Sequence, residues 1–428
     1  MKIKALLLVI ALLASSAWLA HAQEPTSGKN APYTVIANPG ESASKEIRIN
    51  WHTDVDSENS SCTYTERKDT KWKKARTVKA DRELCTAFDS IYSKKPTGED
   101  YYEDARFLRN KASLKELKAG TEYMYKISSD ESGEIRYFKT APKSGKWSVG
   151  IISDFHAYTP LPKRQQVAME MIGTLEQKNG KDFDFILHVG DIVAWGGSYS
   201  FWKILYAEPY FHKYVWAGVN GNHDNMTRKN AQSNSFFRYT NNNPDNGYTG
   251  EEGVCYHFTY SNALFIMLNN ESMRSDEGLA LAKEWVKNVI KNNPAKYIVV
   301  VEHYQWFMGG DGKSSQYERW KELFDEYGVD LAISGNNHIY ARTNAIYDGK
   351  ETDGSLGTVY IQTPSCDNER GQEMGELIHN TDLIKLRWTE GSNTVGAMTM
   401  NADSKQLSLT LYDRNGDEKD RVKVKAKR

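Results

Sequence analysis

Apolar and polar residues follow different patterns in the two parts of this chain. Between residues 32 and 142 they alternate one by one, most clearly over 46–51 and 122–127. Alternation with a period of two predicts strands that bury one face. Clusters of Gly, Asp, Asn and Ser separate these segments. We therefore expect a small β-sandwich over residues 32–142.

From residue 143 onward, short apolar runs alternate with amphipathic helices. The runs at 147–153, 183–189, 214–219, 296–301 and 329–333 predict buried strands. Between them, apolar residues recur at helical spacing in three groups: Val167, Met171, Ile172 and Leu175; Leu281, Trp285 and Val289; Trp320, Leu323, Phe324 and Tyr327. This order predicts a layered α/β domain over residues 143–428. Alternating Val and Lys at 422–428 predict a terminal edge strand with a solvated tail.

The first 22 residues have the pattern of a signal peptide. A short basic start precedes an apolar run at 5–13, and Ala20-His21-Ala22 forms a small-x-small cleavage site. That run is too short to span a bilayer, and no later stretch of about 18 apolar residues occurs. We expect an exported protein, secreted or periplasmic, without a membrane span.

Charge and cysteine content narrow the classes of partner. The chain has 55 basic and 56 acidic residues, a balance that gives no electrostatic reason to expect nucleic acid as a partner. Cys62 and Cys85 match no zinc-binding spacing, so they are interpreted as a disulfide or as buried thiols. Cys255 with Cys366 is a second possible pair. Asn59, Asn225 and Asn270 each begin a glycosylation sequon.

Side chains that can bind metal follow five of the predicted strands. In chain order they are Asp154 and His156; Asp191; Asn222, His223 and Asp224; His303; and Asn336 with His338. One such fragment alone is more often structural than functional. Ligands of α/β sheets bind beyond the carboxyl ends of strands, so five loops of this kind can converge on one rim. Packing alone does not explain all five.

The residue types favour a pair of cations. Two cations about 3.5–4 Å apart need a bridging carboxylate, neutral imidazoles and open positions for water. Oxygen and imidazole ligands without thiolates suit Fe, Mn or Zn. Because the set contains only two carboxylates besides Asp224, the cation pair would stay positively charged and attract a phosphate.

The five blocks resemble the calcineurin-like metallophosphoesterase superfamily, whose order is D-x-H, G-D, G-N-H-D/E, a lone H and G-H-x-H. Residues 114–127 and 135–142 resemble the end of a fibronectin type III-like domain, which makes purple acid phosphatases the nearest match. The resemblance implies that Asp154, His156, Asp191 and His338 hold one metal. It implies that Asp191 bridges to a second metal held by Asn222 and His303. His223 would be the general acid or a clamp on the phosphoryl oxygen, oriented by Asp224, while a bridging hydroxide attacks phosphorus in line.

Two positions depart from the family pattern. Ala194 stands where purple acid phosphatases have their iron-binding tyrosine, and the first block is Asp154-Phe155-His156 rather than D-x-G. We therefore predict a protein without the purple charge-transfer band. In the last block Asn336 replaces a histidine expected to ligate the second metal. Three alternatives follow: a looser site for Mn or Mg, a site filled only with substrate, or loss of catalysis.

These observations favour an exported phosphomonoesterase that acts on a phosphate ester. Two alternatives stay open: a phosphodiesterase or nucleotide hydrolase of the same superfamily, and a non-catalytic binding or adhesion protein with a degraded metal site. The aromatic, Gly-rich loop at 304–310 is either a surface loop or a wall of the cleft, with Tyr304 or Trp306 touching the substrate. Trp195 and the two glycines after it can line the cleft likewise.

Overall fold

The computed structural model describes residues 30–89, 103–128, 130, 132–226, 235–307, 316–374 and 381–427. The predicted signal peptide lies outside the described residues. No helix in the described ranges combines the length and the apolar character needed to cross a bilayer.

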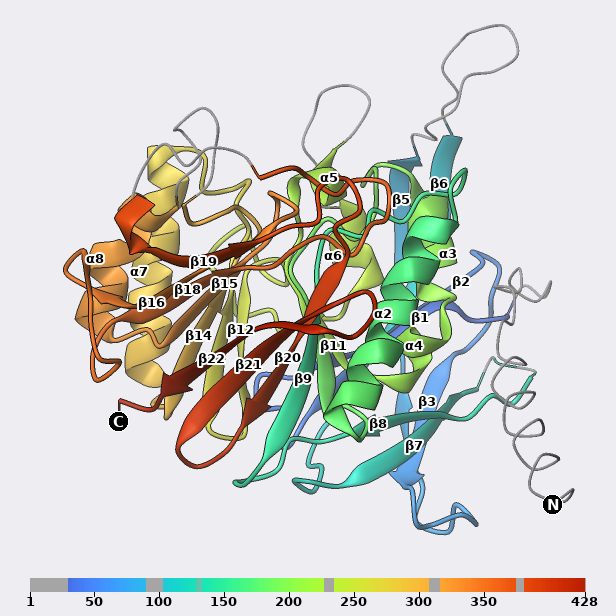
Figure 1. Ribbon diagram of the computed structural model, residues 1–428. Helices are drawn as coiled ribbons and strands as arrows, with labels where there is room; N and C mark the ends of the chain where they lie inside the picture. Colours follow the sequence, from blue (N-terminus) through green and yellow to red (C-terminus); the bar gives the residue numbers. More distant parts are fainter. Residues whose placement is uncertain are drawn as a thin grey trace, which may run out of the picture.

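The N-terminal part is the predicted β-sandwich of two antiparallel sheets (Figure 1). One sheet contains, in spatial order, β1 (Tyr33–Pro39), β2 (Ile47–Thr53), β6 (Glu103–Leu114) and β5 (Asp81–Asp89). The other contains β4 (Arg76–Lys79), β3 (Ser61–Glu66), β7 (Glu122–Ile127) and β8 (Arg136–Lys139). Alternating residues such as Ile47, Ile49 and Trp51 point into the core between the sheets.

The second part is the predicted layered α/β domain, and it contains two mixed sheets. The first sheet has the order β11 (Trp216–Gly218), β10 (Phe185–His188), β9 (Trp147–Ile152), β20 (Gly396–Ala402), β21 (Gln406–Asp413) and β22 (Glu418–Lys425). The second has β12 (Tyr256–Tyr260), β13 (Ala263–Met267), β14 (Tyr297–Val301), β15 (Leu331–Ser334), β18 (Thr358–Gln362), β16 (Tyr340–Tyr347) and β17 (Lys350–Glu351), with β19 (Ile384–Trp388) paired to β16. One apolar cluster containing Ile151, Leu187, Phe265 and Val299 lies between the two sheets.

Helices cover the outer faces of both sheets (Figure 1). Helix α2 (Lys163–Asn179) packs on β9 and β20 of the first sheet, and α7 (Asp276–Asn292) and α8 (Tyr317–Tyr327) pack on the second. Helices α3 (Tyr199–Tyr206) and α4 (Pro209–Lys213) contact β1 of the sandwich, and α6 (Ser235–Thr240), next to α5 (Asn222–Asn225), contacts β2 and β5; η1 (Thr381–Leu383) precedes β19. Helix α2 ends at Gly180, which adopts a left-handed conformation as a C-cap. The predicted stripe of α7 is confirmed at Val289 but wrong at Leu281, which is 50% exposed; the helix also buries Ala282 and Val286.

A polar interface fixes the β-sandwich to the α/β part. Asn38 Nδ2 donates to the carbonyl of Trp216 at 3.0 Å and to Asn241 Oδ1 at 3.1 Å. Arg109 donates from Nε to Asn50 Oδ1 at 3.1 Å and from its terminal nitrogen to the carbonyl of Asn241 at 2.5 Å. These groups are buried, and breaking one partner of a buried hydrogen bond costs about 1–3 kcal/mol. The sandwich is therefore built into the molecule as a fixed layer.

The structure tests the predictions for the four cysteines and for the C-terminal strand. All four cysteines are free and buried, so the buried-thiol alternative holds and the two suggested disulfides do not. Cys62 and Cys85 lie on strands of different sheets, β3 and β5. Strand β22 is the predicted edge strand, but in the described part of the tail Lys427 is not solvated as expected. Lys427 Nζ donates to the carbonyl of Val329 at 2.9 Å, and its side chain is only 9% exposed.

Candidate metal centre

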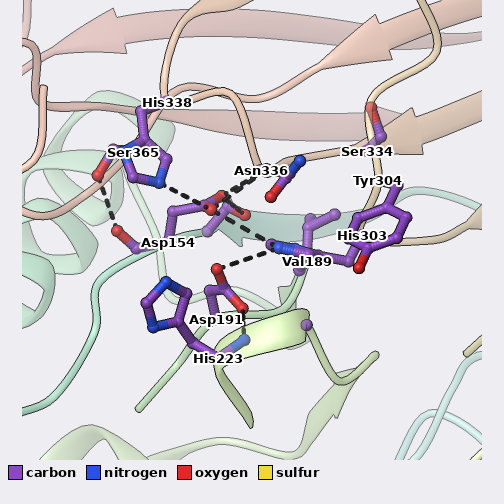
Figure 2. Close-up of polar contacts among 12 residues, drawn as sticks. Asp154, Val189, Asp191, His223, His303, Tyr304, Ser334, Asn336, His338 and Ser365 are labelled. Atoms are coloured by element: carbon purple, nitrogen blue, oxygen red, sulfur yellow. Dashed lines mark hydrogen bonds and ion pairs between the residues drawn. The ribbon is translucent and has the colours of Figure 1, made fainter. Parts of the chain in front are cut away.

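The five predicted loops converge where the carboxyl ends of the two sheets meet (Figure 2). Loops after β9, β10 and β11 come from one sheet, and loops after β14 and β15 come from the other. Ligand atoms fall into three overlapping groups, in each of which they lie within 4.8 Å of one another: Asp154, His156 and His338; His156, Asp191 and His223; Asp154, Asp191 and His303. Residues up to 184 positions apart thus form one cluster.

Asp191 lies at the centre of this cluster. Its Oδ2 is 3.4 Å from Nε2 of His156 and 3.2 Å from Nε2 of His303. Its Oδ1 accepts a hydrogen bond from the backbone amide of His223 at 2.8 Å. Asp191 therefore faces imidazoles from both sheets, which is the position that a carboxylate bridging two cations requires.

Asp154 joins the two sides of the cluster from the loop after β9. Its Oδ1 is 3.4 Å from Nε2 of His338 and 4.0 Å from Nε2 of His303. The backbone amide of Asn336 donates to both of its carboxylate oxygens at 3.2 Å, and Ser153 also donates to it. The carboxylate is fully buried, so its geometry is fixed by these partners.

Backbone carbonyls orient three of the imidazoles. Nδ1 of His303 bonds the carbonyl of Val189 at 2.7 Å, and Nδ1 of His338 bonds that of Arg370 at 2.6 Å. Nδ1 of His223 bonds the carbonyl of Ala194 at 2.9 Å. A ring that donates from Nδ1 keeps an unprotonated Nε2 as a potential ligand, which is the usual arrangement at metal sites.

Several buried polar atoms of the cluster have no hydrogen-bond partner in the described part of the chain. They are Nε2 of His156, Nε2 of His303 and Oδ1 of Asn222. Buried polar atoms are nearly always satisfied, so such a group calls for an explanation. All three are atom types that ligate Fe, Mn or Zn. The residues present therefore fit a centre of two such cations, with thiolates absent from the cluster.

The electrostatics of the cluster favour positive charge between the carboxylates. Burial alone would lower the pKa of His303, but the carboxylates of Asp191 and Asp154 raise it to about 10. Burial alone would raise the pKa of Asp191, yet His303, His223 and His156 hold it well below its usual value. A site that attracts protons this strongly onto an imidazole is one where cations are stabilised.

Backbone strain is concentrated in the same residues. Ten of the described non-glycine residues have a positive φ, and five of them belong to the cluster: Asp154 (52°), His156 (42°), Asp191 (51°), Asn336 (73°) and His338 (58°). Such a conformation costs of the order of 1 kcal/mol or more per residue and persists where the surroundings impose it. Strain at successive ligand positions points to a functional constraint.

Gly221 and Gly335 have no side chain, and the carboxylates of Asp191 and Asp154 occupy the space that a side chain would fill. A Cβ atom on Gly221 would lie 2.1 Å from Oδ1 of Asp191, and one on Gly335 would lie 2.6 Å from Oδ2 of Asp154. Real Cβ atoms do not approach other atoms so closely. The glycines that begin the third and fifth blocks are therefore explained by close approach to the two central carboxylates.

The role expected of Asp224 needs correction. Its carboxylate accepts hydrogen bonds from the amides of Val193 at 3.0 Å and Gly221 at 2.7 Å, and the ring of His223 bonds Ala194 instead. Burial, with the nearby charge of Asp191, raises the pKa of Asp224 to about 7. Asp224 thus ties the second loop to the third and does not orient the imidazole of His223.

The amide of Asn336 is held with its oxygen available. Its Nδ2 donates to Oε1 of Gln305, and in Figure 2 its oxygen faces the cluster. Asparagine also tolerates the left-handed φ of this position better than most residues. The geometry leaves Oδ1 of Asn336 free to ligate weakly beside His303.

A sixth loop, which is not among the five blocks of the sequence, completes the centre. It follows β18 and begins Thr363-Pro364-Ser365-Cys366-Asp367. Ser365 Oγ donates to the carbonyl of Asp154 at 2.7 Å. Asp367 is fully buried, with Oδ2 3.3 Å from Nδ1 of His156 and 3.5 Å from Nε of Arg164. The signal was present, because an apolar run at 358–362 precedes these polar residues as in the other five blocks.

The described part of the aromatic loop, residues 304–307, does not favour the cleft-wall alternative at Trp306. Trp306 is 1% exposed and packs on Phe324 and Tyr360, so it cannot touch a substrate. The hydroxyl of Tyr304 hydrogen-bonds to Arg274 at 2.9 Å and to Glu271. Residues 308–310 of this segment lie outside the described residues. Trp195 is partly exposed. It lies next to the third block, because the backbone amide of the following residue, Gly196, donates a hydrogen bond to the carbonyl of His223.

Two of the three sequons are closed to a glycan in the folded protein. Asn225 is 2% exposed and its Nδ2 donates to the carbonyl of Gly221 at 2.7 Å. Asn270 is 3% exposed and its side chain bonds Glu302 and the amide of His303. Asn59 is exposed.

Comparisons with known proteins agree with this architecture. Residues 148–340 match the family model of calcineurin-like phosphoesterases, and residues 32–140 match that of the purple acid phosphatase N-terminal domain. The chain is 23% identical over 266 residues to purple acid phosphatase 22 of Arabidopsis thaliana, covering 60% of this chain and 58% of that protein. It is 22% identical over 281 residues to acid phosphatase type 7 of Mus musculus, covering 59% and 60%.

Solved structures show the same fold. Purple acid phosphatase PPD1 from yellow lupin (Lupinus luteus) superposes with a TM-score of 0.72 at 18% identity, over 92% of this chain and 74% of that one. PhoD superposes with a TM-score of 0.56 at 13% identity, over 94% of both chains. The chain belongs to the calcineurin-like metallophosphoesterases that carry a purple acid phosphatase N-terminal domain. It spans about 60% of the length of the curated relatives named above.

Proposed function

We propose that this protein is an exported, metal-dependent phosphomonoesterase with two cations in its centre. The observation that carries the proposal is the position of Asp191, whose carboxylate is 3.4 Å and 3.2 Å from imidazoles of opposite sheets. Asp154, His156 and His338 would complete one metal site, and Asn222, His303 and Asn336 the other. Fe, Mn or Zn suits these ligands.

When bound, two such cations supply Lewis acidity and an activated water for attack on phosphorus. The residues of the chain then have distinct tasks. Asp154 and Asp191 contribute two negative charges, fewer than the four or more positive charges of the cations, so the centre attracts an anionic phosphate.

His223 is placed to assist the leaving group. Its Nδ1 is fixed on the carbonyl of Ala194, and its ring lies 4.8 Å from the ring of His156 in an edge-to-face arrangement. Burial lowers the pKa of His223 below its usual value. A proton on its Nε2 is therefore released readily, which suits a general acid or a donor to a phosphoryl oxygen.

Hydrolysis of p-nitrophenyl phosphate and bis-p-nitrophenyl phosphate by protein loaded with Fe, Mn or Zn tests the proposal. We expect turnover of the monoester in at least one metal, and a fall of about 10²–10⁴-fold in kcat for H223A. H212A is the matched control, because His212 lies on α4 and pairs with Glu134 instead. Faster turnover of the diester would favour the phosphodiesterase alternative. Turnover of neither ester in any metal would overturn the proposal.

Export is proposed on the first 22 residues alone. Cleavage after Ala22 would leave Gln23 at the N-terminus. The intact mass of protein recovered from outside the cytoplasm checks this, and a mass that retains residues 1–22 would contradict it.

A further inference from the structure

We propose that Arg370 binds the phosphate group of the substrate directly and gives the site its preference for monoesters. The inference rests on the proposed function and deepens it. Arg370 comes from the sixth loop, three residues after Asp367, and none of the family motifs includes it.

The backbone of Arg370 is part of the metal centre. Its carbonyl accepts the 2.6 Å hydrogen bond from Nδ1 of His338, and its amide donates to the carbonyl of Asp367 at 3.4 Å. The preceding turn is held by the amide of Glu369, which donates to Oδ1 of Asp367 at 2.7 Å. The Cα of Arg370 is therefore fixed beside a candidate metal ligand by contacts that do not involve its side chain.

The guanidinium of Arg370 is unpaired among the residues that the structure describes. No ion pair or hydrogen bond is formed by its side chain there, although the residue is partly buried. The neighbouring arginine of the centre, Arg164, differs in this respect because its Nε lies 3.5 Å from Asp367. A partly buried guanidinium without a counter-ion beside an anion-attracting centre is a ready phosphate ligand.

The charge of Arg370 acts on two histidines of the centre, the partly buried His223 and the fully buried His156. Burial is the largest influence that lowers the pKa of His223, and the positive charge of Arg370 lowers it further. The same charge acts on His156, on which burial and the carboxylates of Asp191 and Asp367 also act. Geometry links Arg370 to the same rings: its carbonyl bonds His338, the ring of His338 lies 5.2 Å from that of His156, and the ring of His156 lies 4.8 Å from that of His223. In the proposal the guanidinium lies over these rings, where it would meet a bound phosphate.

Charge explains the selectivity. A phosphomonoester has three non-bridging oxygens and carries up to two negative charges, whereas a diester has two such oxygens and one charge. Two cations and His223 can satisfy the oxygens of a diester without further help. The guanidinium offers a planar pair of donors for the additional oxygen of a monoester.

The test compares R370A and R370K with the wild type and with R421A, a control that removes an exposed arginine paired with Glu418 on β22. Binding of inorganic phosphate to metal-loaded protein is measured by calorimetry, together with kcat/KM for both aryl phosphates and the bound metal content. R370A is expected to weaken phosphate binding and monoester kcat/KM by about 10- to 100-fold. Its loss on the diester should be smaller, and R370K should recover part of the binding.

Metal content should not change in R370A, because the carbonyl that holds His338 belongs to the backbone. Equal phosphate binding by R370A and wild type would overturn the inference, and an equal loss on monoester and diester would overturn its selectivity. Wild-type protein that binds phosphate but hydrolyses neither ester would refute the proposed function while the binding comparison still tests Arg370. Wild-type protein that binds no phosphate would refute both.

Discussion

The substitution D367N tests whether the sixth loop tunes the metal centre. Asp367 is fully buried, and its Oδ2 lies 3.3 Å from Nδ1 of His156, which has no other partner among the described residues. The carboxylate fixes which ring nitrogen is protonated and leaves Nε2 facing Asp191. Asparagine keeps the shape of the side chain but removes the negative charge that makes the imidazole a stronger ligand.

Loss of such a partner typically weakens metal binding by about 10- to 100-fold, or about 1.4–2.7 kcal/mol. We expect D367N to fall in this range for the metal site that contains His156. The assay is competition for Zn²⁺ or Mn²⁺ with a chromophoric chelator, and thermal unfolding of the metal-free proteins shows whether the variant is folded. D182N, which changes an exposed aspartate paired with Lys213, is the matched control. A folded D367N that binds metal within twofold of wild type would refute the role given to Asp367.

Three further predictions address other features. G221A places a Cβ atom 2.1 Å from Oδ1 of Asp191 and should lower kcat by about 10²-fold, whereas G173A, whose nearest contact is the hydroxyl of Tyr210 at 3.0 Å, should retain activity. Burial raises the pKa of Glu302 from 4.5 to about 8. Between these two pH values the folded protein keeps Glu302 protonated while the unfolded chain releases the proton, so the contribution of Glu302 to the free energy of unfolding is complete below pH 4.5 and is lost as the pH rises through 8. In urea unfolding of metal-free protein, E302Q should therefore gain stability over wild type, on the order of a few kcal/mol, between these two pH values; a constant difference would contradict this. Because all four cysteines are free and buried, a thiol reagent should titrate four groups in unfolded protein and almost none in native protein.

The strands and the larger helices could be predicted because each has a periodic apolar pattern and a clear end. The glycine after α2 and the apolar runs of β9, β10, β14 and β15 are examples. Five of the loops around the centre could be predicted too, since each places metal-binding side chains directly after such a run. The convergence of those loops follows from the parallel strands that precede them.

What could not be predicted depends on contacts between distant residues. Leu281 has the right spacing for the buried face of α7, but the sheet beneath lies closer to Ala282 and Val286. The loop after His303 allowed two interpretations, a surface loop or a cleft wall, and neither anticipated that Trp306 packs on Phe324 of α8 and Tyr360 of β18. Asp224, the acidic residue of the third block, suggested a partner for His223. In the structure its carboxylate accepts hydrogen bonds from the backbone amides of Val193 and Gly221 instead. The left-handed φ of Asp191 and Asn336 leaves no trace in periodicity.

Asp367 and Arg370 show a different limit. Their loop follows β18 in the same way as the other loops follow their strands, yet its described part, residues 363–374, contains no histidine. Their importance appears only when the fold brings the carboxylate to Nδ1 of His156 and the Arg370 carbonyl to His338. Residues that support or extend a metal centre are harder to detect from sequence than the ligands, because their chemistry is defined by what they touch.

The most direct test of the account is a crystal structure of metal-loaded protein with anomalous scattering recorded at the absorption edge of the bound metal. The account predicts two peaks about 3.5–4 Å apart, with the carboxylate of Asp191 between them. One peak lies beside Asp154, His156 and His338, and the other beside Asn222 and His303. A single peak, or peaks that avoid Asp191, would contradict the two-cation centre.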